Sequence, residues 1–291
     1  MNAIETEHLT KFYGKARGIT DVSLSVREGA FFGFIGPNGA GKSTLIRTLL
    51  GLISPTSGTA SVFGLDVTAH RTEILQDVGY LPSETHFYGG MTVRETIALS
   101  ARLRRVDCTE EAKQLCERLD LDPSKRIGAL SLGNRKKVGI VCALQHRPKL
   151  YVFDEPTSGL DPLMQKEFYS ILGERNADGA TVFLSSHVLS EIEHYCTDAA
   201  IIREGRLLVS DSVSRLSHTG VKRVTLVGVA ALPSLPHVRD VRAESEGLSF
   251  LYDGKPAELL SVLSALSPTD FSVTDPDLDE VFLHYYEKED Q

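Results

Sequence analysis

A glycine-rich turn that ends in lysine and serine carries the clearest chemistry in this chain. Residues 36–43 read Gly-Pro-Asn-Gly-Ala-Gly-Lys-Ser, between an apolar run at residues 30–35 and a helix-forming run at residues 44–50. This strand, turn and helix context predicts a P-loop. Glycines let successive backbone N–H groups point inward around an anion, and the N-terminus of the following helix adds its dipole.

The predicted loop offers a group to each part of a nucleoside triphosphate. Lys42 can reach the β- and γ-phosphates as a mobile positive charge, and the Ser43 hydroxyl can ligate Mg²⁺. We therefore expect a nucleotide site in which Lys42 is also catalytic. Its expected nucleotide-binding residues are Gly36, Pro37, Asn38, Gly39, Ala40, Gly41, Lys42, Ser43 and Thr44.

Two carboxylates follow an apolar run later in the chain. Residues 150–153 read Leu-Tyr-Val-Phe and are followed by Asp154 and Glu155. Ligands of open α/β sheets bind at the carboxyl ends of the strands. Asp154 is expected to hold Mg²⁺, usually through water, and Glu155 to orient or deprotonate an attacking water. Such a pair could also be a solvated strand end, but the P-loop upstream favours the functional interpretation.

Composition limits the class of protein. The 291 residues allow one large domain and a small one, and 42% hydrophobic with 24% charged residues is typical of a globular protein. The net charge of −8 argues against charge-driven binding to nucleic acid. No apolar stretch approaches the roughly 18–20 residues of a membrane span, the N-terminus does not read as a signal peptide, and the four cysteines lack metal-ligand spacing. We expect a cytoplasmic protein that reaches a membrane only through a partner.

Short apolar runs alternate with helical periodicity over most of the chain. Strands are predicted at residues 3–9, 21–26, 59–63, 150–153, 181–184 and 199–202, with helices between about residues 93 and 145. This alternation predicts an α/β fold whose parallel sheet is covered on both faces. Beyond residue 220 the pattern changes to a strand at 221–227, a hairpin at 238–252, a helix that opens at Pro256 and a final helix at about 278–286.

The order of further motifs resembles the nucleotide-binding subunit of ATP-binding cassette (ABC) transporters, in its single-cassette, drug-export-like form. The similarity covers about residues 3–215. Tyr13 precedes the P-loop, as does the aromatic residue that stacks on adenine in this family. Residues 130–134 occupy the position of the LSGGQ signature, residues 158–161 match the D-loop, and His187 matches the switch histidine.

The resemblance implies a P-loop NTPase fold, with an antiparallel β subdomain and a helical subdomain at about residues 84–148. The cassette would span residues 1–215, and residues 220–291 would form a small α+β appendage whose role stays open between dimer contact, packing and regulation. The cofactors would be ATP and Mg²⁺. Two cassettes would close head to tail on ATP, with Ser131, Gly133 and Asp161 as further nucleotide-binding residues and Glu155, His187 and Lys42 as catalytic residues. Tyr13 could instead be an ordinary packing aromatic.

Three positions depart from the family pattern or leave a choice. Leu132 replaces the first glycine of the signature and Asn134 its glutamine. Ser83 stands where the family usually has the glutamine that senses Mg²⁺ and water, so Glu84 is a candidate replacement. The aromatic segment at residues 86–91 would line the groove that receives a permease, or would pack under its own loop.

We therefore expect an ATPase subunit that acts with a separate integral-membrane permease chain and a second, identical cassette. Such a protein would lie at the cytoplasmic face of the cell membrane, with no nucleic acid as a partner. The alternative is a soluble cassette ATPase acting on ribosomes or nucleic acid, although a single cassette without a long coiled coil disfavours it. A kinase or GTPase is disfavoured by the signature and by the absence of a guanine-reading motif.

Overall fold

The chain divides at residue 211 into two structural units. The computed structural model describes residues 1–217, 221–229, 231–233 and 235–275. The first unit is Met1–Asp211 and the second is Ser212–Gln291. The domain limits that the sequence suggested, residues 1–215 and 220–291, stay a prediction.

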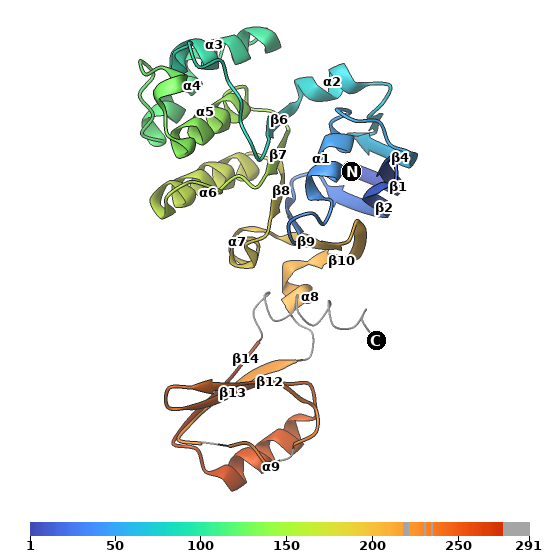
Figure 1. Cartoon of the computed structure of the whole chain (residues 1–291), viewed down its shortest axis with the longest axis vertical. Coiled ribbons are helices and arrows are strands. Elements are labelled where there is room, and N and C mark those ends of the chain that lie inside the picture. Colours follow the sequence, from blue (N-terminus) through green and yellow to red (C-terminus); the bar gives the residue numbers. More distant parts are fainter. Residues whose placement is uncertain (218–220, 230, 234, 276–291) are drawn as a thin grey trace. The chain divides into compact units, whose positions relative to one another are not determined.

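A six-stranded sheet runs through the first unit (Figure 1). Its strand order is β10-β9-β3-β8-β7-β6, and all its strands from β9 to β6 pair in parallel. The bounds are β3 Phe31–Ile35, β6 Val78–Leu81, β7 Leu150–Asp154, β8 Thr181–Ser186, β9 Asp198–Arg203 and β10 Arg206–Ser212. Every residue of β3, β7 and β8 is buried, as expected for parallel strands covered on both faces. The predicted α/β fold is confirmed.

A second, antiparallel sheet contains the first strands of the chain. Its order is β2-β1-β4-β5, with bounds β1 Asn2–Tyr13, β2 Ala16–Arg27, β4 Ser57–Val62 and β5 Leu65–Asp66. Strands β1 and β2 are longer than the strands predicted from the sequence. Their backbone pairing continues to Tyr13↔Ala16, beyond the last buried apolar residues. Helix α1 (Lys42–Leu49) joins the two sheets, since its Leu45 and Ile46 share one apolar core with Leu9 and Phe34.

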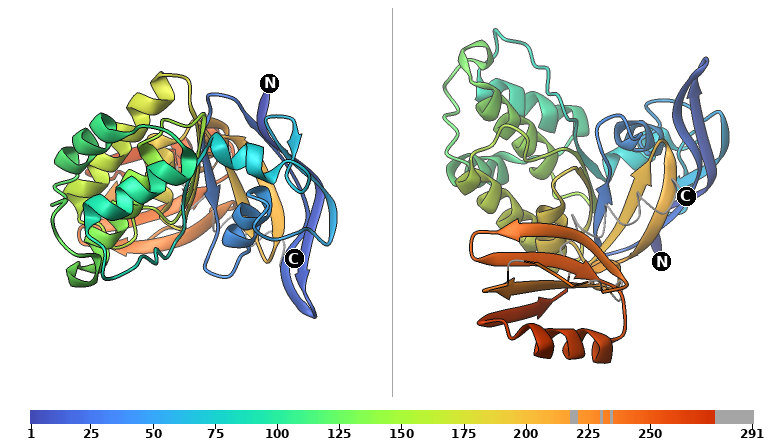
Figure 2. Two further views of the ribbon diagram at one scale, coloured as in Figure 1. Left: turned by 90° about the horizontal axis from the view of Figure 1, so that it is seen from above. Right: turned by 60° about the horizontal axis from the view of Figure 1, so that its bottom comes forward.

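Helices α3, α4 and α5 form a group away from the antiparallel sheet (Figures 1 and 2). A capping box starts α3, in which Thr92 accepts a hydrogen bond from the Glu95 N–H and Glu95 accepts one from the Thr92 N–H. The predicted helical region is confirmed. The helices of the first unit are α2 Arg71–Gln76, α3 Val93–Arg104, α4 Thr109–Arg118, α5 Leu132–Leu144, α6 Pro162–Ala177 and α7 Leu189–Tyr195, besides α1 and a 3₁₀ turn at Ile127–Ala129.

An ion-pair network ties α4 to α6. Arg118 of α4 lies 2.5 Å from Glu167 and 2.6 Å from Glu174, both on α6. Hydrogen bonds to these carboxylates raise the pKa of Arg118 and lower that of Glu174. Partly exposed pairs contribute only about 0–1 kcal/mol each, so the network orients α4 more than it stabilises the unit.

The second unit packs one helix on an antiparallel sheet of order β12-β13-β11-β14. Its core joins Val224, Leu226 and Phe250 of the sheet to Leu259 and Leu263 of the helix. The predicted hairpin and the helix that opens at Pro256 are confirmed, and the helix suggested at 278–286 lies outside the described residues. The bounds are α8 Val213–Ser217, β11 Lys222–Val227, β12 Val238–Glu244, β13 Gly247–Tyr252, α9 Pro256–Leu266 and β14 Asp270–Thr274.

The four cysteines are free thiols. Cys108, Cys116 and Cys196 are buried and Cys142 is half-buried. Burial raises the pKa of the Cys142 thiol to about 12 and also raises that of Cys196. Among the described residues, no helix combines the length and the apolar character that a membrane crossing requires.

Candidate functional site

The parallel register brings three predicted motifs to one edge of the main sheet. Ile35 pairs with Ser186, and Asp154 pairs with Ser185. The P-loop follows β3, Glu155 follows β7 and His187 follows β8. These segments therefore start at the carboxyl ends of neighbouring strands, where ligands of parallel sheets bind.

Lys42 is buried at this edge and is held by the turn to which it belongs. Its Nζ donates to the Gly36 carbonyl oxygen at 2.6 Å and to the Pro37 carbonyl oxygen at 3.3 Å. Gly41, just before α1, has a left-handed φ of 109°, which glycine adopts without strain. The loop backbone thus curls round the ammonium at the N-terminus of α1, where the helix dipole and free N–H groups favour a phosphate.

Glu155 lies between Lys42 and His187. Its Oε1 is 3.0 Å from Lys42 Nζ in an ion pair without hydrogen-bond geometry, and its Oε2 is 2.7 Å from His187 Nδ1. The Glu155 backbone has a φ of 51°, a conformation that costs a non-glycine residue about 1 kcal/mol or more. Strain of this kind gathers at functional sites. The structure thus places Glu155 in contact with both of the other predicted catalytic residues.

Asp154 carries an oxygen that lacks a partner. Its side chain is fully buried, and Oδ1 accepts a hydrogen bond from Ser185 Oγ at 2.7 Å. Oδ2 is buried and has no hydrogen bond within the described part of the chain. A buried unsatisfied polar atom costs about 1–3 kcal/mol, and more when the group is charged. Oδ2 therefore fits a cation or a water bound to one.

The donor set at this edge fits Mg²⁺ by chemistry. Mg²⁺ keeps several waters and takes one or two protein oxygens together with substrate phosphates. Asp154 and Ser43, which lies in the first turn of α1, supply oxygens of this kind. In the described ranges, no cluster of three or more His, Cys, Asp or Glu could enclose a metal.

Tyr13 lies close to the end of the P-loop. It is the last residue of β1 and is 46% exposed. A Cβ placed on Gly18 would lie 2.9 Å from Thr44 Cγ2 and 3.1 Å from Tyr13 Cε2. The tyrosine ring and Thr44 therefore flank the same point, and Lys11 Nζ lies over the ring at 5.4 Å from its centroid.

The signature and the D-loop lie at two helix N-termini. Ser131 is the N-cap of α5, where its Oγ accepts from the Asn134 N–H at 3.2 Å. Asp161 is the N-cap of α6 and accepts from the Met164 N–H at 3.0 Å. Among the described residues, no hydrogen bond or ion pair joins residues 131–133 to the P-loop of the same chain. Within the part of the chain that the structure describes, Ser131, Gly133 and Asp161 therefore share no hydrogen bond or ion pair with the cluster around Lys42.

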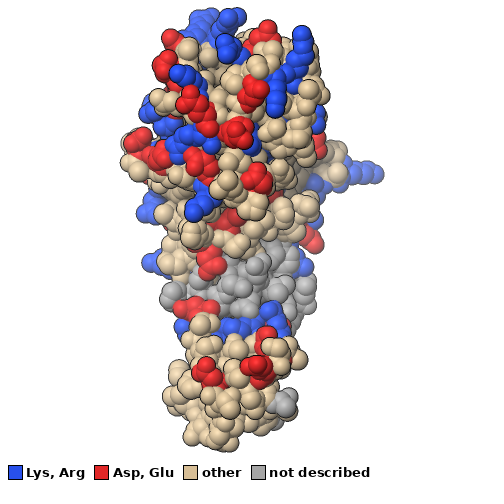
Figure 3. All heavy atoms as spheres, turned by 90° about the vertical axis from the view of Figure 1, so that its left-hand side faces the viewer, with Lys and Arg blue, Asp and Glu red and all other residues tan. Residues whose placement is uncertain are grey.

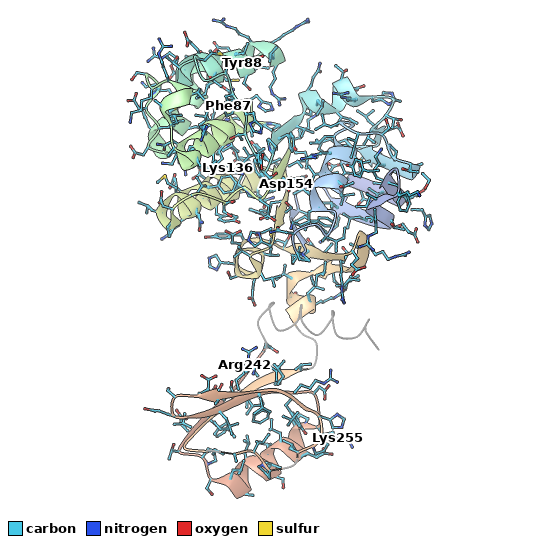
Figure 4. All side chains as sticks on the ribbon, viewed as in Figure 1. Phe87, Tyr88, Lys136, Asp154, Arg242 and Lys255 are labelled. Atoms are coloured by element: carbon cyan, nitrogen blue, oxygen red, sulfur yellow. The ribbon has the colours of Figure 1, made fainter. Side chains whose placement is uncertain are left out.

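In the segment after β6, Glu84 does not lie where the sequence interpretation would place it. The segment also contacts Lys136, a residue that the sequence analysis did not single out. The Glu84 side chain is 84% exposed and pairs with His86 at 3.5 Å, so it does not enter the buried site as a replacement for glutamine. The Ser83 carbonyl accepts a hydrogen bond from Lys136 of α5, and Figure 4 labels Lys136 beside Asp154. Sequence reasoning missed Lys136, because nothing in its local pattern shows which backbone lies next to it.

Comparison with known proteins places these motifs in a family. The family model described as ABC transporter matches residues 19–158. The bacitracin transport ATP-binding protein BcrA of Bacillus licheniformis is 40% identical over 211 residues, which are 70% of this chain and 68% of that protein. The linearmycin resistance ATP-binding protein LnrL of Bacillus subtilis (strain 168) is 29% identical over 304 residues and is matched over 97% of both chains.

Solved structures agree with this similarity. An ATP-binding subunit of an ABC transporter superimposes with a TM-score of 0.69 at 30% identity, over 74% of this chain and 91% of that chain. A dimeric, post-hydrolysis ATP-binding cassette bound to ADP and phosphate shares the fold, with a TM-score of 0.65 at 23% identity over 72% of this chain and 98% of that chain. With the nucleotide motifs gathered at one sheet edge, this protein belongs to the ABC transporter family as a single ATP-binding, ATP-hydrolysing cassette.

Proposed function

We propose that the chain is the energy-supplying subunit of an exporter. Two identical copies would close head to tail on two ATP molecules and drive a separate integral-membrane permease from the cytoplasmic face of the cell membrane. The observation that carries this proposal is the separation of the site into two parts. Glu155 contacts both Lys42 and His187, whereas the signature lies at the exposed N-terminus of α5. A second copy would supply the missing half.

The cluster at the sheet edge suits this cycle. A γ-phosphate that reaches Lys42 competes with Glu155 for the ammonium, and this competition frees the carboxylate to accept a proton from water. His187, released from Glu155, could then donate to the phosphate. Mg²⁺ held by Ser43 and Asp154, when bound, would offset the charge that develops on the phosphate oxygens. Ser131 Oγ and the Gly133 N–H would contact the phosphate bound by the other copy.

An exposed aromatic segment supports docking onto a permease. Tyr88 is exposed while the backbone around it is fixed, since the Gly128 N–H donates to Gly89 and Arg126 donates to Gly90. Figure 4 shows Phe87 and Tyr88 beside the helical group. A rigid loop that presents an aromatic ring is a suitable contact for a partner. The relatives named for bacitracin transport and linearmycin resistance favour export of an antibiotic-like compound.

Charge on the surface also supports this proposal over binding to nucleic acid. On the face shown in Figure 3, basic and acidic side chains are interspersed over the first unit. A nucleic-acid surface would need clustered positive charge, and the chain carries a net charge of −8.

The test is purification of a tagged Glu155→Gln chain from gently solubilised membranes in the presence of ATP and Mg²⁺. Loss of the carboxylate should slow hydrolysis about 10²–10⁴-fold while Lys42 remains free to hold phosphate. We expect a second copy of the chain and a multi-span membrane protein to copurify in stoichiometric amounts, as identified by mass spectrometry. A tagged Lys42→Ala, Glu155→Gln chain is the matched control and should lose the ATP-dependent contact with the second copy. Ribosomal proteins or nucleic acid in place of a membrane protein would contradict the transporter proposal.

A further inference from the structure

Lys136 is a buried cation to which the mechanism above gives no role. It lies in the second turn of α5, and its side chain is 3% exposed. Its Nζ donates to the Ser83 carbonyl oxygen at 2.9 Å and to the Pro82 carbonyl oxygen at 3.4 Å. Within the described residues, backbone carbonyls rather than a carboxylate hold this ammonium. Burial of an ammonium without an ion pair costs free energy that hydrogen bonds must offset, so the two carbonyl contacts fix this side chain in place.

The electrostatic surroundings show that the burial is costly. Burial lowers the pKa of Lys136 to about 8, although the nearby charges of Asp154 and Glu155 act in the opposite direction. The lysine therefore lies close enough to the catalytic carboxylates to feel their field, yet it bonds to the loop beside them. A methionine of similar length would fill the space without a buried charge.

Lys136 connects two segments that face different parts of the site. Pro82 and Ser83 follow β6, and β6 pairs with β7 through Leu81↔Phe153, directly beside Asp154. Helix α5 begins at Ser131, in the signature. The two segments also pack closely, because a Cβ on Gly139 of α5 would lie 2.7 Å from Leu81 Cδ1.

We propose that Lys136 is a positioning residue that locks the Pro82–Ser83 segment, at the chain's own nucleotide site, to the signature helix that serves the nucleotide of the second copy. This inference rests on the ATP-closed dimer proposed above. A displacement of the segment when ATP and Mg²⁺ fill the sheet edge is passed through the two hydrogen bonds to α5, and so to Ser131. Ser83 acts through its backbone carbonyl, which explains how this chain can function without a long polar side chain at that position.

The experiment measures two quantities in the Glu155→Gln background. The first is the affinity of the single chain for a fluorescent ATP analogue, and the second is the ATP concentration at which half of the protein is dimeric by light scattering. Lys136→Met should leave the first within about twofold and raise the second about tenfold, which corresponds to about 1.4 kcal/mol. Lys136→Gln, which keeps an N–H donor, should recover part of the loss.

Lys137 provides the matched control. It is the next residue of α5 and is 7% exposed, and no hydrogen bond to residues 82–83 is found for it among the described residues. Lys137→Met should dimerise as the parent does. If it weakens the dimer as much as Lys136→Met, the effect belongs to charge on α5 and the inference is wrong.

Other outcomes separate this inference from the proposed function. If the Glu155→Gln parent stays monomeric in ATP, the proposed function fails and the inference falls with it. If the parent dimerises and Lys136→Met matches it, only the inference is overturned. An equal loss of nucleotide affinity and dimerisation would show that Lys136 supports its own site alone, which also overturns the inference. Should Lys136→Met fold poorly, Lys136→Ala repeats the test with the same expected result.

Discussion

At the scale of single residues, Lys42 is already paired with a carboxylate of the protein, with which a phosphate at the P-loop would have to compete. Lys42 is buried, and its ammonium contacts two carbonyls of its own loop together with Glu155. Removing one partner of a buried pair leaves the other charge uncompensated, which is more costly than loss of the contact alone. The ion pair with Glu155 lacks hydrogen-bond geometry, so it is the contact that a phosphate can most easily replace.

Lys42→Ala should abolish hydrolysis and weaken ATP binding, because the phosphates lose their mobile positive charge and Glu155 keeps only His187. The measurements are phosphate release and binding of a fluorescent ATP analogue. Lys149→Ala is the control, because Lys149 is an exposed lysine that pairs with Asp77 at 3.0 Å; its turnover should be unchanged. Near-normal turnover in Lys42→Ala would overturn the assignment of the P-loop.

The residues of the site could be predicted from the sequence only where residue type and order carry the information. The P-loop and the Asp154–Glu155 pair have a chemistry that is readable from spacing. The ion pair of Lys42 with Glu155 and the bond from Ser185 to Asp154 depend on strand register, which no local pattern specifies. Glu84 was a plausible replacement for glutamine on residue type, but its side chain leaves the site for solvent and pairs with His86.

At the scale of elements, the start of α5 is packed directly against the D-loop. A Cβ on Gly133 would lie 2.7 Å from the Gly159 carbonyl oxygen, which is backbone and cannot move aside as a side chain does. Gly133 is in the first turn of α5, and Gly159 lies between β7 and α6. The signature and the D-loop therefore hold each other in place, so a displacement of α5 is felt at the start of α6.

Gly133→Ala and Gly173→Ala make the same substitution in two helices but should have different effects on activity. Both glycines are in helices, where alanine is favoured by about 1 kcal/mol. Gly173, inside α6, has nothing within 4 Å of a new Cβ, so Gly173→Ala should raise stability by about 0.5–1 kcal/mol with unchanged ATPase activity. Gly133→Ala should instead displace the D-loop and lower kcat at least about tenfold. Thermal melts and ATPase assays check both, and equal activity of the two variants would contradict the packing argument.

The presence of helices and strands could be predicted from the sequence better than the residues at which they begin and end. Apolar runs located β7, β8 and β9, and helical periodicity located the region from α3 to α5. The hairpin of β1 and β2 extends well beyond its apolar residues because backbone pairing, rather than burial, sets its length. The pattern of Leu259 and Leu263 located α9, since these residues form the face that packs on the second sheet.

At the scale of the whole molecule, both structural units fall within the similarity to known cassettes. The match to the linearmycin resistance protein covers 97% of both chains, so that protein resembles this one in the second unit as well. The family model covers only residues 19–158. The sequence alone showed a change of character near residue 220, but not what the second unit does.

Alkylation of the shielded thiols can report local unfolding of the chain. A thiolate is the reactive form, and burial raises the pKa of Cys108, Cys116, Cys142 and Cys196. We expect alkylation at pH 7.5 to be slow in the folded chain and fast in urea, as followed by mass spectrometry of each peptide. Cys116 and Cys142 lie in the helical group, and Cys196 lies just before β9. The alkylation rate of each cysteine would therefore report how often its own region opens. Rapid labelling of Cys196 in the native chain would contradict the burial described. If ATP slows labelling of Cys116 and Cys142 but not of Cys196, nucleotide binding stabilises the helical group and leaves the region before β9 unchanged.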